Sequence, residues 1–293
     1  MSRKTRGAPD FICIGPEKTG TTLLYALLQK HPQVSLPPIK ELRYWDEGYN
    51  IPKHSLRVFF SSDHWHYTLL RKRLKFSFLR EIKRLVAFRW REPTNFYWRL
   101  DYSLGRHNDD WYERILRAEP LLAGDISPLY YHLPEKRIAD VHRYHQKIKI
   151  IIFIRDPIER AWSKIKMNLL THRKRGIDEL DFEEFKRYSE AVHRKWVPYR
   201  ETIALWSRLF SQVHVALYDD LQSNQANWYE DICQFLTIDR QTRDQDKAEY
   251  INISKKIDLP SPFQNILIQQ YGEEIRALVD DYPHLNWLEK YDL

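Results

Sequence analysis

The residues from Gly15 to Thr22, Gly-Pro-Glu-Lys-Thr-Gly-Thr-Thr, join a short apolar run to a helical pattern. They supply two glycines, a lysine and three threonines, which are residue types that surround a bound phosphate. The apolar run Phe11–Ile14 predicts a strand, and the residues after Gly20 predict a helix whose first backbone N–H groups face the same anion. The segment therefore predicts a phosphate-binding loop built from Lys18, Thr19, Gly20, Thr21 and Thr22.

The loop departs from the pattern that binds nucleoside triphosphates, Gly-x-x-x-x-Gly-Lys-Ser/Thr. Thr21 stands where the lysine of that pattern belongs, and Lys18 lies inside the loop instead. This difference disfavours ATP or GTP as the ligand. A nucleotide kinase or NTPase stays open as an alternative enzyme class.

A second group of residues suited to an anion follows the apolar segment Ile148–Ile154. Arg155 comes at the end of this predicted central strand, and Ser163 lies about two turns into the helix that Pro157 is placed to begin. Because strand ends meet at one crevice in a parallel sheet, both side chains are expected to face the loop at Gly15–Thr22. The alternative is that Arg155 caps a carbonyl group or pairs with a neighbouring carboxylate.

Short apolar runs alternate with helical patterns along the chain, which is typical of a mostly parallel sheet covered on both faces. We therefore expect an α/β fold, a P-loop-like sheet flanked by helices on both sides. No linker rich in Pro, Gly or Ser divides the 293 residues, so we expect one domain with a helical insertion over about 50–118. We predict strands at Phe11–Ile14, Val34–Leu36, Leu121–Gly124, Ile148–Ile154 and Val213–Leu217, and helices near 21–31, 134–145, 157–173, 182–192, 196–210, 225–236 and 263–281.

The composition favours a folded protein that binds an anionic partner. Hydrophobic residues make up 43% of the chain, and the formal net charge is +7. A nucleotide, a polyanionic chain, a membrane surface and a nucleic acid all satisfy such a charge. Only two cysteines are present and no apolar segment is long enough to cross a bilayer, which predicts a soluble protein of a reducing, cytoplasmic compartment.

Residues 68–91 carry apolar side chains at helical spacing among many lysines and arginines. Such a basic amphipathic helix packs its apolar stripe on a core, or offers a surface to a polyanionic acceptor or to a membrane as a peripheral contact. Because of this stretch, a protein that binds nucleic acid or another polyanion without catalysis stays open as an alternative. We do not expect a nucleic-acid partner. The histidine pairs His64/His66 and His142/His145 lack partners at metal-ligand spacing, so no metal is expected.

Together, the loop after the first strand and the Arg/Ser pair after a later strand resemble the sulfotransferases that use 3′-phosphoadenosine-5′-phosphosulfate (PAPS). The resemblance implies that PAPS is the sulfuryl donor, that 3′-phosphoadenosine-5′-phosphate (PAP) is the product, and that no metal is required. It implies that Lys18, Thr19, Gly20, Thr21 and Thr22 hold the 5′-phosphosulfate and that Arg155 and Ser163 hold the 3′-phosphate. In this family a basic late loop covers the nucleotide. Lys255 and Lys256 occupy that place here, which implies that they bind the nucleotide. The Lys-Gly-Arg form that this loop has in the family members that sulfate glycans is missing, and the alternative is that both lysines are simply solvated.

The segment Pro37–Asp46 follows the second predicted strand and carries Lys40 and Glu41. Sulfuryl transfer requires a base for the acceptor proton and positive charge near the leaving phosphate. We therefore expect Glu41 to act as the general base, with Lys40 and Lys18 stabilising charge. The segment resembles the Lys-Glu-x-x-aromatic-aromatic-Asp stretch of heparan sulfate and related glycan sulfotransferases, which implies a hydroxyl of a glycan, a glycolipid or another lipid-linked sugar as acceptor. The basic amphipathic helix and the many aromatic residues leave an aromatic, lipid or other hydroxyl acceptor as an alternative. A surface ion pair is the alternative for Lys40 and Glu41.

The residues Asp125–Tyr131 follow the third predicted strand and resemble a family segment that lines the acceptor cleft. The resemblance implies acceptor contacts for Asp46, Ser127 and Tyr130. The glycan enzymes carry a lysine near the position of Ile126, which this chain lacks. The alternatives are that Ser127 caps a turn and that Tyr130 belongs to the core.

Overall fold

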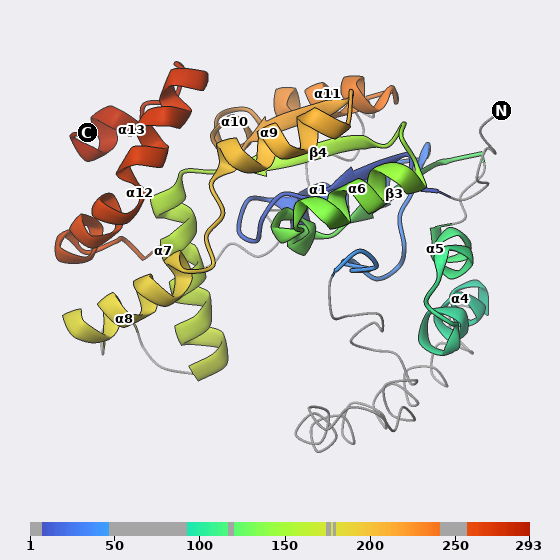
Figure 1. Cartoon of the computed structure of the whole chain (residues 1–293), viewed down its shortest axis with the longest axis horizontal. Helices are drawn as coiled ribbons and strands as arrows, with labels where there is room; N and C mark the ends of the chain where they lie inside the picture. Colours follow the sequence, from blue (N-terminus) through green and yellow to red (C-terminus); the bar gives the residue numbers. More distant parts are fainter. Residues whose placement is uncertain (1–7, 47–92, 117–119, 174–176, 178–179, 241–256) are drawn as a thin grey trace.

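The computed structural model describes residues 8–46, 93–116, 120–173, 177, 180–240 and 257–293 (Figure 1). The predicted basic helix at 68–91 and the late-loop lysines Lys255 and Lys256 lie outside these residues. Their predicted roles therefore stay predictions.

A parallel sheet forms the centre of the molecule, and its strands confirm the predicted ones to within a few residues. The strand order is β2-β3-β1-β4-β5, and every pair is parallel. The chain thus crosses over β1 between β3 and β4, so β1 and β4 are neighbours whose carboxyl ends lie together. The strands are β1 (Phe11–Cys13), β2 (Val34–Ser35), β3 (Leu122–Ile126), β4 (Lys149–Ile154) and β5 (Val213–Leu217).

Helices cover both faces of the sheet, which confirms the predicted α/β class (Figure 1). The helices are α1 (Thr21–Gln29), α4 (Pro93–Leu104), α5 (Asp109–Leu116), η1 (Pro128–His132), α6 (Glu135–Tyr144), α7 (Pro157–Met167), η2 (Asn168–Arg173), α8 (Phe182–His193), α9 (Tyr199–Leu209), α10 (Tyr218–Ser223), α11 (Gln225–Leu236), α12 (Ser261–Asp281) and α13 (Trp287–Tyr291). The predicted helix at 157–173 is correct only as far as Met167, because residues 168–173 continue as a π-helix.

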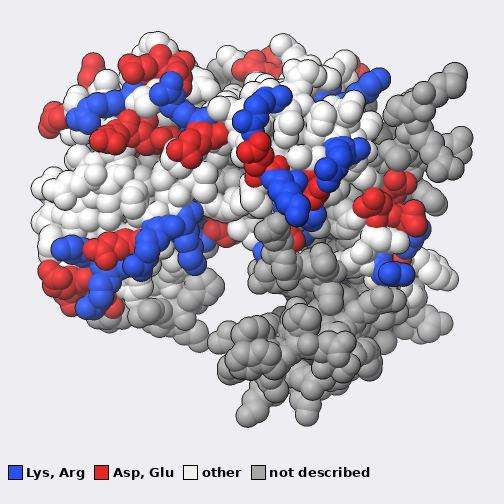
Figure 2. All heavy atoms as spheres, viewed as in Figure 1, with Lys and Arg blue, Asp and Glu red and all other residues white. Residues whose placement is uncertain are grey.

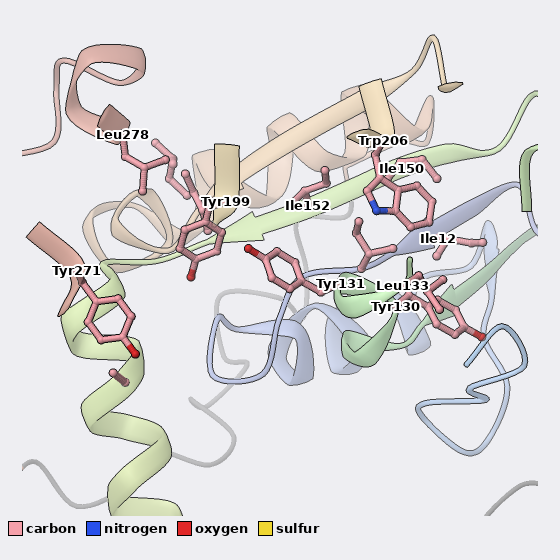
Figure 3. Packing of buried hydrophobic residues seen from close by; sticks show 14 of the residues in the cluster. Ile12, Tyr130, Tyr131, Leu133, Ile150, Ile152, Tyr199, Trp206, Tyr271 and Leu278 are labelled. Atoms are coloured by element: carbon pink, nitrogen blue, oxygen red, sulfur yellow. The ribbon is translucent and has the colours of Figure 1, made fainter. Parts of the chain in front are cut away.

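The two faces of the sheet follow from the period-2 alternation of side chains along each strand. Ile12, Ile150 and Ile152 point to one face and pack with Trp206 of α9 and Tyr131 of η1 (Figure 3). The neighbouring residues of the same strands, such as Phe11 and Ile151, point to the other face and pack against α1 and α11. Full burial of each such side chain contributes roughly 1.5–3 kcal/mol, so the sheet is a rigid base for the loops at its edge.

The described surface mixes both signs of charge. Figure 2 shows Lys and Arg side chains interspersed with Asp and Glu on this face rather than gathered in a single basic stripe. Within the described ranges, no helix is both long enough and apolar enough to cross a bilayer.

Candidate functional site

The amino end of α1 is open to an anion. Gly20 caps this helix with a φ of 99°, a conformation that favours glycine, and no side chain caps the free N–H groups of the first turn. The first turn also carries no acidic residue. Unsatisfied N–H groups and the positive end of the helix dipole therefore face the loop Gly15–Thr22, as the sequence predicted.

Gly15 brings this loop against the neighbouring strand. A Cβ atom at Gly15 would lie 2.5 Å from the Cβ of Phe153 on β4, a distance that real side chains do not reach. Within the loop, the Thr19 hydroxyl donates to the carbonyl of Pro16 at 2.7 Å and is buried. Thr19 thus shapes the loop with its side chain, and its backbone is left to meet a ligand.

The two predicted anion sites meet directly. Arg155 follows β4, and its Nη1 donates to the carbonyl of Lys18 at 3.0 Å. The guanidinium lies over the ring of Tyr218, the first residue of α10, at 4.3 Å from the ring centre. Arg155 also lies 3.5 Å from Glu159, so it has the carbonyl and carboxylate contacts of the alternative reading as well. These contacts fix the orientation of the guanidinium beside the loop.

The amino end of α7 differs from that of α1 because it is closed. The side chain of Asp156 accepts hydrogen bonds from the backbone N–H groups of Ile158 and Glu159. An anion at this end of the sheet must therefore be held by side chains rather than by the helix backbone. Arg155 is placed for that role, and Ser163 lies buried further along the same helix.

Three cationic side chains of α7 that the sequence analysis did not single out also lie around the loop. Arg160 donates to the carbonyl of Glu17 at 3.2 Å, and Lys164 pairs with the Glu17 carboxylate. Burial lowers the pKa of Lys18, and the charges of Arg155, Lys164 and Lys166 lower it further. The four-residue spacing of Arg160 and Lys164 places them on one helix face, a signal that the sequence contained.

Such a gathering of like charges raises the free energy of the loop. Opposite charge from a bound polyanion offsets this repulsion, and restores the pKa of Lys18 toward its usual value. The site is therefore electrostatically suited to a ligand with more than one phosphate-like group.

The loop after β2 is attached to the same helix end by Lys40. Its Nζ donates to the hydroxyls of Thr21 at 3.1 Å and Thr22 at 3.3 Å, and it lies 3.7 Å from the carboxylate of Glu41. Burial lowers the pKa of Lys40, while the charge of Glu41 opposes that shift. The Glu41 side chain is 38% exposed, so its carboxylate is accessible next to the loop Gly15–Thr22.

Backbone strain is concentrated in these two loops. Lys18, Glu41 and Arg43 have φ values of 75°, 68° and 59°, in the left-handed region that side chains other than glycine rarely adopt. Each such residue costs of order 1–3 kcal/mol and persists only where the surrounding contacts impose it. Strain of this kind is common in loops that hold a reactive or binding side chain in place.

The structure gives Ser127, Tyr130 and Asp46 partners within the protein, and their acceptor contacts stay predictions. Ser127 and Tyr130 are fully buried, and both hydroxyls donate to the carboxylate of Asp125, at 2.7 and 2.8 Å. Asp46 is buried as well and accepts from Nε of Arg43 at 2.6 Å. Ser127 and Tyr130 also accept from the backbone N–H groups of Arg43 and Trp45, so all three side chains are connected to the loop that carries Glu41.

The carboxyl-terminal helix braces the Arg155 region. The Asp156 carboxylate accepts from Lys290 at 2.8 Å and from the Tyr291 hydroxyl at 2.6 Å, and Lys290 also lies 3.1 Å from Glu159. Trp287 of the same helix donates to Asp219 of α10, next to Tyr218. These contacts join α13 to both elements that hold Arg155, and short terminal helices of this kind leave little sequence signal.

The end of the late loop also lies on α7. The carbonyl of Ile257 accepts from Nε1 of Trp162 at 2.9 Å and from Nζ of Lys166 at 3.3 Å. In the part of the chain that the structure describes, no group of three or more His, Cys, Asp or Glu side chains is arranged to hold a metal.

Comparison with known proteins agrees with this geometry. The model of the Sulfotransferase family matches residues 9–242 of the chain. No curated protein matches the sequence. Among solved structures, a sulfotransferase from Alicyclobacillus acidocaldarius has 19% sequence identity and a TM-score of 0.57, with 93% of this chain and 94% of that one covered.

The sulfotransferase domain of the Synechococcus PCC 7002 olefin synthase has 18% identity and a TM-score of 0.51, with 90% of this chain and 93% of that domain covered. These similarities show a shared fold, while the family match spans most of the sequence and includes the loop Gly15–Thr22, Arg155 and Ser163. The chain therefore belongs to the sulfotransferase family and is a PAPS-dependent sulfotransferase.

Proposed function

We propose that the protein transfers the sulfuryl group of PAPS to a hydroxyl of a glycan or glycolipid, with Glu41 as general base. The observation that carries the proposal is the contact between Arg155 and the Lys18 carbonyl at 3.0 Å, with the Lys40–Glu41 pair at the same helix end. A nucleotide that spans from Lys18 to Arg155 presents its sulfur on the side where Glu41 lies. The 5′-phosphosulfate binds the loop Gly15–Thr22, and the 3′-phosphate binds Arg155 and Ser163.

In the proposed reaction, the acceptor oxygen attacks sulfur while the Glu41 carboxylate takes its proton. The bond between sulfur and the bridging oxygen breaks, and PAP leaves with the electron pair of that bond. Lys18 and Lys40 neutralise the charge that grows on the departing phosphate, as in phosphoryl transfer, where positioning and electrostatics dominate. The Lys40-Glu41-x-x-Tyr44-Trp45-Asp46 pattern supports a sugar hydroxyl as the acceptor group.

The experiment measures transfer of radiolabelled sulfate from PAPS to octyl β-glucoside, a soluble glycolipid mimic. Glu41→Gln keeps the size of the side chain but removes the base, so we expect kcat to fall by roughly 10²-fold while the affinity for PAP stays within about twofold. Glu135→Gln is the matched control, because Glu135 is an exposed glutamate that pairs with Arg208 on the surface.

Unchanged kcat in Glu41→Gln would remove Glu41 from the role of base. Labelling of a protein or of an aromatic phenol in place of the sugar would overturn the acceptor class and leave the base assignment intact.

A further inference from the structure

The carboxylate of Asp125 is the centre of a buried polar cluster that the sulfuryl-transfer scheme does not use. It lies at the end of β3, is 1% exposed, and accepts three hydroxyl hydrogen bonds. Ser127 donates to one oxygen at 2.7 Å, and Tyr112 and Tyr130 donate to the other at 2.8 Å each. These hydroxyls come from η1, its preceding residue and α5, so the carboxylate ties several elements together.

Two of the three hydroxyls continue to the loop that carries Glu41. The backbone N–H of Arg43 donates to Ser127 Oγ at 3.3 Å, and that of Trp45 donates to the Tyr130 hydroxyl at 3.4 Å. Figure 3 shows the Tyr130 hydroxyl directed toward this loop. The Tyr112 hydroxyl shares the carboxylate but has no such bond to the loop backbone among the contacts of the described residues.

The direction of these bonds follows from the inventory of donors and acceptors. An ionised carboxylate only accepts hydrogen bonds, so each hydroxyl must donate its single proton to Asp125. The lone pairs of the Ser127 and Tyr130 hydroxyls then stay available as acceptors. The backbone N–H groups of Arg43 and Trp45 donate to them. A carboxylate at the centre therefore orients both hydroxyls as acceptors for the loop.

The strained backbone of this loop explains why such anchors are needed. Glu41 and Arg43 both have positive φ values, with the buried Leu42 between them. On the upstream side, Lys40 is held by the hydroxyls of Thr21 and Thr22. On the downstream side, the bonds to Ser127 and Tyr130 hold the backbone within two to four residues of Glu41.

We infer that Asp125 is a positioning residue for sulfuryl transfer, which acts through Ser127 and Tyr130 to hold the Glu41 loop in its strained conformation. This inference rests on the proposed role of Glu41. Asp125 touches neither donor nor acceptor, and its effect reaches the reaction only through the backbone of Arg43 and Trp45.

The structure offers a matched pair of variants. Tyr130→Phe and Tyr112→Phe each remove one hydroxyl from the same carboxylate oxygen, at the same distance, from a fully buried tyrosine. Only Tyr130→Phe also removes an acceptor from a backbone N–H of the loop, whereas the Tyr112 hydroxyl meets the side chain of Trp45. We expect Tyr130→Phe to lower kcat for octyl β-glucoside by about tenfold and Tyr112→Phe by less than twofold, with PAP affinity unchanged in both.

Hydrogen exchange provides a readout that needs no acceptor. We expect the amide of Trp45, followed in peptides covering residues 41–46, to exchange about tenfold faster in Tyr130→Phe than in Tyr112→Phe. Ser127→Ala removes the acceptor of the Arg43 amide, so exchange at Arg43 tests the second hydrogen bond to the loop in the same way. This variant replaces Tyr130→Phe if the latter does not fold. In the double variant Glu41→Gln/Tyr130→Phe, kcat should be little lower than in Glu41→Gln alone. The carboxylate that Tyr130 helps to position is already absent there.

Equal kcat values or equal exchange rates in the two tyrosine variants would overturn the inference, as would a loss of kcat that follows a loss of PAP affinity. Failure of the proposed base is distinguishable, because it appears as full turnover in Glu41→Gln regardless of the tyrosine pair. An inactive Glu41→Gln together with indistinguishable tyrosine variants would overturn the positioning role alone.

Discussion

Replacing Arg155 by alanine tests whether this side chain recognises the 3′-phosphate of the donor. A guanidinium–phosphate contact contributes about 1.5–3 kcal/mol, which corresponds to roughly 10–150-fold in a dissociation constant. Arg155 is held in advance by the Lys18 carbonyl and by the Tyr218 ring, and its side chain is only 16% exposed. Little conformational entropy is therefore lost on binding, and we expect the upper part of this range, about 30–100-fold weaker binding of PAP.

The assay compares two nucleotides by titration calorimetry. PAP carries the 3′-phosphate, whereas adenosine 5′-phosphosulfate lacks it and should lose less than about threefold in affinity. Arg160→Ala is the control, because Arg160 also donates to a carbonyl of the loop, that of Glu17, and also lies over an aromatic ring, that of Trp196. We expect Arg160→Ala to affect both nucleotides alike. Equal losses for both nucleotides in Arg155→Ala would show that Arg155 supports the loop and does not read the 3′-phosphate.

Two further predictions follow from charged groups around the site. Burial raises the pKa of Asp125 to about 6, so the folded protein keeps its proton longer than the unfolded chain does. The free energy of unfolding should therefore fall by about 2 kcal/mol more in the wild type than in Asp125→Asn as the pH rises from about 4 to about 6, measured by urea denaturation. Matching pH dependence in the two proteins over this range would show that the carboxyl is ionised throughout in the folded protein. Lys290 holds Glu159, which also lies near Arg155, so Lys290→Ala should free that carboxylate to compete for the guanidinium and weaken PAP binding by up to about fivefold. Glu159→Gln in the same chain should restore the affinity, and no restoration would exclude the competition.

The local parts of the site were predictable from the sequence. The apolar run before Gly15, the glycine at the start of the next helix and the hydroxyls after it predict a strand, a tight loop and an open helix start, because the signal comes from adjacent residues. The uniformly apolar Ile148–Ile154 segment likewise indicates a strand buried on both faces. Arg155 was placed correctly because it follows that strand at once.

The parts that depend on distant contacts were not predictable in the same way. The bracing of Asp156 by Lys290 and Tyr291 joins residues 134 and 135 positions apart, and no periodicity reports such a pair. The resemblance to a family segment predicted acceptor contacts for Ser127 and Tyr130, but it gave no sign that both hydroxyls donate to the buried carboxylate of Asp125. The π-helix at 168–173 was not predicted either, because six residues are too few to distinguish its period from that of an α-helix.

The structure of the protein with PAP bound tests the central claim most directly. We expect the 5′-phosphate to lie on the N–H groups at the start of α1 beside Lys18, and the 3′-phosphate to lie within hydrogen-bond distance of Arg155. The Glu41 carboxylate should face the open side of the 5′-phosphate, where sulfur sits in the donor. A nucleotide bound in the reverse direction, or away from the contact between Arg155 and Lys18, would contradict it.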